Sequence, residues 1–328
     1  MKENKGRARS SIGRRRSGAM SREDQRIRVA WFYYIEGLTQ NEVAKRVGLS
    51  RPLVNQILAS CRAEGLIQIR LDSDISSCTR LAGELISRFG LLDAVVTPAP
   101  AHPENLARTI GLQAGFYLSD QLSHDLQIAI GWGETLWHSL KGVERQNLRN
   151  SSISSMLGGL TRYAEISAYE TATRLADMLS AHCYYLAAPV YTDDAKTRDL
   201  FVNQPMLQEV FSRVRSADIA LCSVGQMDAQ ATLHRLELVG EDDLADLTAH
   251  HAVGDLLGHY LDAEGNVVDC DLNSRVVAAH PADLRNIERV VLASGGQTKV
   301  EIINAVLRAR YANVLVTDEE TAELLCEI

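Results

Sequence analysis

The sequence has few cysteines, and none of them is spaced for metal or disulfide chemistry. Its six cysteines are scattered over 328 residues without a C-x-x-C motif, so it carries no signature of a zinc knuckle or a disulfide framework. No apolar run is long enough to span a membrane, and the first residues lack the apolar region of a signal peptide. We therefore expect a cytoplasmic protein with reduced, buried thiols and no membrane association.

The chain also lacks the motifs that identify common enzymes. It contains no nucleophile elbow, no Walker loop, no paired-carboxylate motif and no internal repeat. His250, His251 and His259 match no standard ligand spacing, and the first two are adjacent and would point apart on a helix. We expect no metal, no cofactor and no catalytic residues, because no positioned acid and base can be assembled from the sequence.

Charge is divided unevenly along the chain, whose length allows two domains. Residues 1–71 contain 15 Lys and Arg against 6 Asp and Glu, a net charge of +9. Residues 72–328 contain 19 Lys and Arg against 36 Asp and Glu, a net charge of −17. The overall charge of −8 is therefore the sum of a basic N-terminal part, the head, and an acidic remainder, the body. This division predicts that only the head meets phosphate groups.

Residues 39–58, TQNEVAKRVGLSRPLVNQIL, have the pattern of a helix, a tight turn and a second helix. Thr39 begins the first helix, and Glu42 three residues later completes a capping box. Gly48 supplies the turn, and Ser50 is a favourable N-cap for the second helix. The segment is typical of a helix-turn-helix.

The second of these helices has an apolar face and a polar face. The side chains expected to point inward are Leu53, Val54, Ile57, Leu58 and Cys61, and those expected outward are Arg51, Asn55, Gln56 and Arg62. In the major groove, Arg matches guanine and Asn or Gln matches adenine. The residues we expect to meet DNA are Thr39, Gln40, Ser50, Arg51, Pro52, Asn55 and Gln56. The alternative is an ordinary helical hairpin with a solvated polar face.

The segments around this motif complete a small domain. A helix over residues 22–37 is predicted to form its core through Ile27, Ala30, Trp31, Tyr34 and Ile35. Alternation over residues 66–71 predicts a strand, the wing of a winged helix. The expected divisions are a disordered basic tail at 1–20, a helix-turn-helix domain at 21–72, a linker helix within 73–90 and an effector-binding domain at 91–328.

From residue 93 onward, apolar strands alternate with helices. Strands are predicted at 94–97, 127–130, 152–157, 184–188, 219–223, 289–293 and 314–317, and helices at 104–122, 134–140, 168–180, 206–214, 299–310 and 319–326. Such alternation is typical of a parallel α/β sheet covered on both faces. Ligands of these sheets bind beyond the carboxyl ends of the strands, so a ligand site is expected in the loops that follow the strands.

Two glycine-containing loops follow predicted strands early in this domain. The first comprises Gly131, Trp132, Gly133, Glu134 and Thr135, and the second contains Gly158 and Gly159. Glycines let a backbone approach a ligand closely, and N–H groups at a helix start favour an anion. Either loop could instead be a tight strand–helix turn.

Two charged residues stand in later glycine-rich segments. Lys299 follows Gly295 and Gly296, and a capping box of Thr298 with Glu301 would place this lysine in the first helical turn. An effector anion bound between Lys299 and the N–H groups of Gly295 and Gly296 would offset the unfavourable helix dipole, although the lysine could also point to solvent. Asp255 precedes a strand-like stretch at 257–261, and in apolar surroundings its carboxylate needs partners such as sugar hydroxyls or a backbone cap.

In combination, these segments resemble the SorC family of sugar-responsive bacterial transcription regulators, also grouped as SorC/DeoR type. The segments that carry the resemblance are residues 37–50, 131–136, 254–255 with 261–265, 293–299 and 313–319. The resemblance implies a winged-helix-like head and a Rossmann-like body related to sugar-phosphate isomerases. It further implies dimers of dimers and a sugar, sugar phosphate or polyol effector contacting Gly131–Thr135, Gly158, Gly159, Asp255 and Lys299.

We therefore expect a non-enzymatic regulator of a carbohydrate or polyol catabolic operon. Its partners would be double-stranded operator DNA, a small sugar-like effector and copies of itself in a homodimer or homotetramer. Two alternatives remain open from the sequence. One is a sugar-phosphate isomerase or deaminase with an accessory DNA-binding head, and the other is a constitutive DNA-binding architectural protein with a vestigial body.

Overall fold

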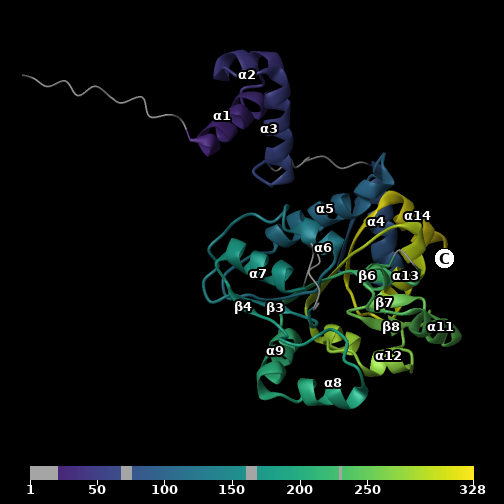
Figure 1. Cartoon of the computed structure of the whole chain (residues 1–328). Coiled ribbons are helices and arrows are strands. Elements are labelled where there is room, and N and C mark those ends of the chain that lie inside the picture. The colour runs from purple at the N-terminus through teal and green to yellow at the C-terminus, as the bar shows by residue number, and fades with distance from the viewer. Residues whose placement is uncertain (1–20, 68–75, 160–167, 229–230) are drawn as a thin grey trace, which may run out of the picture. The chain divides into compact units, whose positions relative to one another are not determined.

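The computed structural model of the chain describes residues 21–67, 76–159, 168–228 and 231–328 (Figure 1). It divides into two compact units, residues 1–69 and 70–328, which we call the head and the body. Among the described residues, no helix is both long enough and apolar enough to cross a membrane.

The head consists of α1 (Arg22–Tyr34), α2 (Gln40–Val47) and α3 (Arg51–Ala63). The predicted capping box forms at the start of α2, where the Glu42 carboxylate accepts the Thr39 N–H at 2.8 Å. Gly48 ends α2 in the left-handed conformation, with φ of 70°. Ser50 then caps α3, so the predicted helix-turn-helix is confirmed.

The core of the head is formed by one buried side of each helix. Its buried members are Val29, Val43, Ala44, Val54 and Leu58. The inward face predicted for the first helix is correct at Ala30 and Tyr34, which are buried or pack against this core. It is wrong at Ile27, Trp31 and Ile35, which are exposed by 46%, 54% and 66%. Helical spacing alone does not decide which side faces α2 and α3, and the side that includes Val29 and Ala30 packs there.

Two further expectations for the head concern its edges. The strand predicted over residues 66–71 is not present at Leu66 and Ile67, where the Ile67 N–H instead donates to the Cys61 carbonyl at 3.3 Å. The remainder of that strand, and the tail at residues 1–20, lie outside the described residues.

The body is built on a seven-stranded parallel sheet with the order β1-β10-β9-β5-β2-β3-β4. The strands are β1 (Asp93–Thr97), β2 (Gln127–Ile130), β3 (Ser152–Ser155), β4 (His182–Tyr184), β5 (Ile219–Cys222), β9 (Arg289–Ala293) and β10 (Val314–Asp318). A smaller antiparallel sheet contains β6 (Val224–Gln226), β7 (Gly254–Leu256) and β8 (His259–Leu261). The parallel α/β architecture predicted from the sequence is thus confirmed.

Helices cover both faces of the large sheet (Figure 1). One face carries α5 (Leu106–Asp120), α6 (Glu134–Ser139) and α7 (Ala168–Leu179), and the other carries α4 (Ser76–Phe89), α9 (Pro205–Arg215), α13 (Val300–Arg308) and α14 (Glu319–Glu327). Alternate residues of a strand enter the two cores: Ile219 and Leu221 face the first set of helices, and Ala220 and Cys222 face the second. The helix expected as a linker is α4, which contributes Leu81 and Leu85 to the second core.

Shorter elements lie outside these two layers. They are α8 (Ala195–Val202), α10 (Thr232–Arg235), α11 (Glu241–Ala249), α12 (Asp271–Ser274) and the 3-10 turns Pro103–Asn105, Pro281–Asn286 and Gln297–Lys299. The strand predicted over 184–188 is mostly wrong, because β4 ends at Tyr184 and the buried Leu186 packs in a separate cluster with α9. The stretch 257–261 is not one strand, because Leu257 and Gly258 form a turn with positive φ between β7 and β8.

The close packing of α5 on α6 gives a first stability prediction. A Cβ added to Gly115 would lie 1.9 Å from the Ser139 carbonyl oxygen, so the backbones must separate. We expect Gly115→Ala to lower the free energy of unfolding by about 1–3 kcal/mol, the usual size of an overpacking penalty. Gly83→Ala in α4 is the matched control, since a Cβ there meets open space.

The two variants are expected to change stability in opposite directions. Ala is favoured over Gly in a helix interior by about 0.5–1 kcal/mol, so Gly83→Ala should be slightly stabilised. Denaturant unfolding of both proteins measures the difference. Wild-type stability in Gly115→Ala would contradict the close approach of the two helices.

Candidate functional site

The polar side chains of α3 form an exposed surface on the head. Arg51, Asn55 and Gln56 are all exposed, as predicted. The Gln40 amide at the start of α2 donates to Asn55 at 3.3 Å, and its Oε1 accepts from Arg51 Nε at 3.4 Å. These contacts hold the first residue of α2 beside the first turns of α3. In a helix-turn-helix, the N-terminal turns of the second helix are the part that meets base edges.

The remaining predicted DNA contacts lie next to this group. Thr39 and Ser50 are exposed N-cap residues of α2 and α3, and Pro52 is exposed in the first turn of α3. Leu53 departs from the prediction, because it is 40% exposed although its spacing placed it on the inward face. The buried side of α3 is supplied by Val54, Leu58 and Cys61, and the partly buried Ile57 packs beside them as predicted.

A cavity of about 230 Å³ lies in the body at the carboxyl end of the parallel sheet. It is placed where β2 and β5 are neighbours but the chain continues in opposite directions, from β2 to β3 and from β5 toward β9. Such a switch point leaves a crevice between diverging loops and is the usual ligand position in open α/β sheets. Of the predicted effector contacts, Gly131, Trp132, Gly133, Glu134, Thr135, Asp255 and Lys299 all line this cavity.

Asp255 is the buried charge of the cavity, and the small sheet positions it. It lies on β7 opposite Gly225 of β6, and its Oδ2 accepts the Gly258 N–H at 3.0 Å. Gly225 is required for this arrangement, since a Cβ there would lie 2.0 Å from Asp255 Oδ1. Burial raises the pKa of Asp255 to about 6, although the Gly258 N–H and the Lys299 charge both act to lower it.

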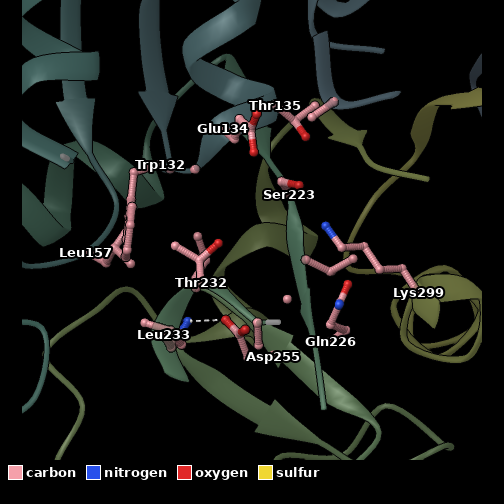
Figure 2. Close-up of a pocket in the computed structure, with 18 of the residues that line it drawn as sticks. Trp132, Glu134, Thr135, Leu157, Ser223, Gln226, Thr232, Leu233, Asp255 and Lys299 are labelled. Atoms are coloured by element: carbon pink, nitrogen blue, oxygen red, sulfur yellow. Dashed lines mark hydrogen bonds between the residues drawn. The ribbon is translucent and has the colours of Figure 1, made fainter. Parts of the chain in front are cut away.

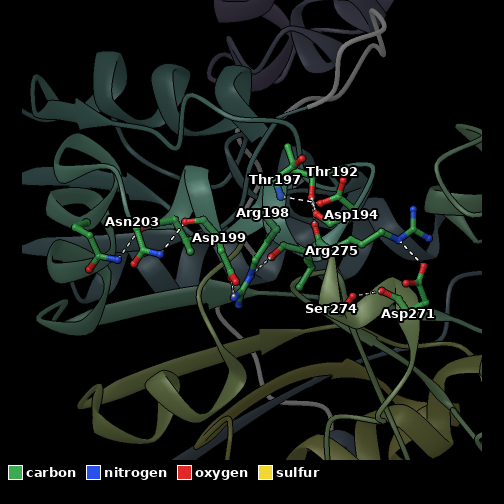
Figure 3. Close-up of polar contacts among 12 residues, drawn as sticks. Thr192, Asp194, Thr197, Arg198, Asp199, Asn203, Asp271, Ser274 and Arg275 are labelled. Atoms are coloured by element: carbon green, nitrogen blue, oxygen red, sulfur yellow. Dashed lines mark hydrogen bonds and ion pairs between the residues drawn. The ribbon is translucent and has the colours of Figure 1, made fainter.

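The turn that caps Asp255 is braced from outside the cavity. Tyr191 donates its hydroxyl to the Gly258 carbonyl at 2.6 Å. Arg275 contacts Asp271 of α12 at 2.9 Å (Figure 3). It also contacts Asp243 of α11 at 2.8 Å, which joins the helices before and after the β7–β8 hairpin. The carboxylate is therefore held on a supported hairpin.

Lys299 extends into the cavity from the side opposite Trp132 (Figure 2). Burial lowers the pKa of Lys299, and the carboxylates of Asp255, Glu134 and Asp228 act to raise it. The capping box predicted at this helix start is wrong, because α13 begins without a side-chain cap. Thr298 instead donates its hydroxyl to Gln226 Oε1 at 3.1 Å, which ties the 3-10 turn to the small sheet.

The loop after β2 forms another wall. Gly131 continues the ladder by donating its N–H to the Leu221 carbonyl at 2.9 Å, and Gly133 has φ of 131°. That conformation turns the chain directly into α6, so Glu134 and Thr135 reach the cavity from the first helical positions. A carboxylate thus already stands at the positive end of this short helix.

The other predicted glycines are not among the described residues that line the cavity. Gly158 and Gly159 are buried, and a Cβ on Gly158 would lie 2.6 Å from the Ala188 and Pro189 carbonyl oxygens. A Cβ on Gly295 would lie 2.2 Å from Asp318 Oδ1, while Gly296 adopts φ of 101°. Close packing accounts for Gly158 and Gly295, and turn geometry accounts for Gly296. The role of all four glycines as effector contacts stays a prediction.

Several lining residues were missed from the sequence. Polar ones include Ser223, Gln226, Thr232 and Arg235. Ser223 directly follows β5, so the rule that located the Gly131 loop could have found it. Thr232 and Arg235 lie on the four-residue helix α10, which is too short to show a periodic pattern. In the part of the chain that the structure describes, no cluster of His, Cys, Asp or Glu could hold a metal.

The raised pKa of Asp255 gives a stability prediction with a definite sign. Its folded pKa of about 6 exceeds the ordinary value of 3.8, so the folded state binds the proton more tightly than the unfolded state. The contribution of Asp255 to the free energy of unfolding therefore falls as pH rises from about 4 to about 6 and stays low above that. Asp255→Asn removes this dependence.

We expect Asp255→Asn to match wild type near pH 4 and to be more stable at pH 8 by up to roughly 3 kcal/mol. Denaturant unfolding of both proteins across this range measures the difference, in which contributions from other titrating groups cancel. A constant difference between the two proteins from pH 4 to pH 8 would contradict the burial of this charge.

Each of the two units matches a known protein family. A sugar-binding domain family matches residues 73–327, and a winged helix-turn-helix DNA-binding family matches residues 36–68. The transcriptional regulator LsrR of Escherichia coli is 30% identical over 308 residues, which cover 92% of this chain and 94% of LsrR. The chain belongs to the SorC family of sugar-binding transcription regulators.

Other members of the family extend this similarity over nearly the whole chain. The erythritol catabolism regulatory protein EryD of Brucella abortus is 28% identical over 91% of this chain and 95% of EryD. The full-length sorbitol operon regulator SorC of Klebsiella pneumoniae shares the fold, with a TM-score of 0.72, 24% identity and coverage of 93% and 99% of the two chains. These relatives are named as regulators, so the chain is a DNA-binding transcription regulator rather than an enzyme.

Proposed function

We propose that the protein controls a carbohydrate or polyol catabolic operon in the cytoplasm and that an effector bound in the body cavity changes its hold on the operator. The observation that carries this proposal is the Asp255 carboxylate, which is buried in a cavity at the topological switch point. A buried carboxylate is costly unless several donors surround it, and among the described residues the donor hydrogen-bonded to it is the Gly258 N–H. Adjacent hydroxyls of a sugar or polyol would supply more.

The rest of the lining suits a ligand rich in hydroxyl groups. Neutral donors and acceptors stand around the cavity on Thr135, Ser223, Gln226 and Thr232 (Figure 2). Such groups can both give and receive hydrogen bonds, as hydroxyls do. EryD and SorC are named for erythritol and sorbitol, which are uncharged polyols, and this agrees with the chemistry of the lining.

The charges in the cavity favour an uncharged effector over a phosphate ester. Among the described lining residues the cations are Lys299 and the exposed Arg235, and the anions are Glu134 and Asp255. The charges of three carboxylates, on Asp255, Glu134 and Asp228, already act on Lys299, so little positive charge is left for a phosphate dianion. In this proposal Lys299 holds the most polar end of the ligand, and Asp255 accepts its hydroxyls.

The DNA-binding part of the proposal requires more than one head. One helix-turn-helix covers a half-site, and useful affinity normally requires two. We propose a homo-oligomer, at least a dimer and a tetramer on DNA, held together through the body because that unit is the larger. Light scattering with and without operator duplex tests this, and a stable monomer that binds one half-site tightly would contradict it.

The effector proposal is tested with matched pairs of four- to six-carbon polyols or sugars and their monophosphates. Each compound is assayed by thermal unfolding and by operator gel shift. The expected result is that an uncharged member raises the melting temperature, is not converted to product and changes operator binding, because a ligand that binds only the folded state stabilises it. Turnover, or no shift with any compound, would contradict the proposed function.

A further inference from the structure

Leu53 is an apolar side chain placed on the reading side of α3. It is the third residue of this helix, its N–H donates to the Ser50 hydroxyl at 3.4 Å, and its side chain is 40% exposed. The buried side of α3 is completed without it by Val54, Leu58 and Cys61. Of the large apolar residues in this helix, all of which the structure describes, Leu53 is the one left exposed.

The neighbours of Leu53 on the exposed side of α3 are polar. Gln56 lies three residues further on, close to Leu53 on the helix surface, and it is exposed. Asn55 and Arg51 are linked through Gln40 beside the same two turns of the helix. Leu53 thus borders Gln56 at the edge of this polar group, at the helix end that contacts base edges.

We propose that Leu53 contacts the 5-methyl group of a thymine in each operator half-site and so helps to determine sequence specificity. Thymine carries the apolar group that distinguishes its edge in the major groove, and apolar side chains read it by contact. Leu53 reaches this group while Gln56 and Arg51 hydrogen-bond with neighbouring base edges. This inference rests on the DNA-reading role of α3 and adds a base preference that the polar residues do not supply.

The alternative is that Leu53 faces solvent without a role, since single exposed apolar residues are common on protein surfaces. The two cases differ in one measurable respect. A thymine contact makes affinity depend on the methyl group itself, whereas a solvent-facing leucine does not. Replacing thymine by uracil removes the methyl group and leaves base pairing and the hydrogen-bonding edge unchanged.

The test begins by selecting bound duplexes from a random-sequence library with the full-length wild-type protein. Each thymine of the selected half-site is then replaced singly by uracil, at the same position in both half-sites, and the Kd is measured for wild type, Leu53→Ala and Gln56→Ala. At one position we expect uracil to weaken wild-type binding by about fourfold per half-site, the size of burying one methyl group. Leu53→Ala should bind both duplexes equally, and Gln56→Ala should keep the methyl effect.

Two results would overturn the proposal: no uracil position affects the wild type, or Leu53→Ala shows the same loss as the wild type. Circular dichroism checks that Leu53→Ala keeps the helical head, which is expected because the side chain is not part of the core. If the library yields no preferred sequence, the DNA-reading role of α3 fails, and this inference fails with it. A preferred sequence without a methyl effect removes only the role of Leu53.

Discussion

Lys299→Ala and Asp255→Ala are each expected to leave operator affinity unchanged and to weaken the response to the effector strongly. Both side chains line the body cavity, and neither belongs to the head that carries the DNA-reading surface. A hydrogen bond to a charged group is worth roughly 1.5–3 kcal/mol, so each loss should weaken effector binding by about 10- to 150-fold. Operator gel shifts titrated with the effector measure both quantities on the same samples.

The relative size of the two losses identifies the chemistry of the effector. For an uncharged polyol, Asp255→Ala should be the more damaging change, because the carboxylate accepts the hydroxyls. For a phosphate ester, Lys299→Ala should be the more damaging. Lys196→Ala is the matched control, since it removes an exposed lysine of α8 that does not line the cavity. An unchanged response in both cavity variants would place the effector elsewhere.

The stability of Asp255→Asn distinguishes the loss of an effector contact from a loss of folding. Because Asp255 is costly to bury as an ion, Asp255→Asn should gain stability at pH 8 while it loses effector affinity. A cavity that keeps a destabilising charge is expected where the ligand supplies the missing partners. If Asp255→Asn instead unfolds more easily at pH 8 and does not respond to the effector, the role of Asp255 is structural only.

The sheet and part of the cavity could be predicted from the sequence because they depend on local patterns. Buried parallel strands are short apolar runs, and six of the seven runs predicted for the large sheet coincide with its strands. The exception is 184–188, which shares only Tyr184 with β4. The loops that follow β2 and β9 carry glycines and a charged residue at the carboxyl edge, so a general rule for α/β sheets located Gly131 and Lys299 correctly in the cavity. The general rule for ligand positions in parallel α/β sheets was enough to find these two residues.

The remaining features depend on contacts between distant segments. The small sheet pairs Gly225 with Asp255, thirty residues further along the chain, and three-residue strands leave no alternation to detect. Glycine is equally ambiguous: at Gly133 it turns the chain into the cavity, whereas at Gly158 it allows two backbones to touch. Similarly, the spacing of Trp31 and Leu53 indicates a helix without indicating which neighbours exist to bury them.

The reading surface of the head provides the last prediction. Gln56→Ala and Arg51→Ala are each expected to weaken specific operator binding by about 1–3 kcal/mol per half-site, while folding is nearly unchanged because both side chains are exposed. The loss should be largest at the base pair that each side chain reads. For Gln56 this is expected to be an adenine, where its amide can bond to two groups at once.

Arg28→Ala is the control for charge alone, because it removes an exposed arginine from α1 of the same head. Loss of a nonspecific phosphate contact weakens binding to all sequences alike and reduces the salt dependence of binding. Loss of a base contact instead changes the order of preference among operator variants. Kd values for the operator and for single-base variants at two salt concentrations therefore distinguish the two roles. If Gln56→Ala and Arg51→Ala bind and discriminate like wild type while Arg28→Ala is weakened, then α3 is not the helix that reads the operator.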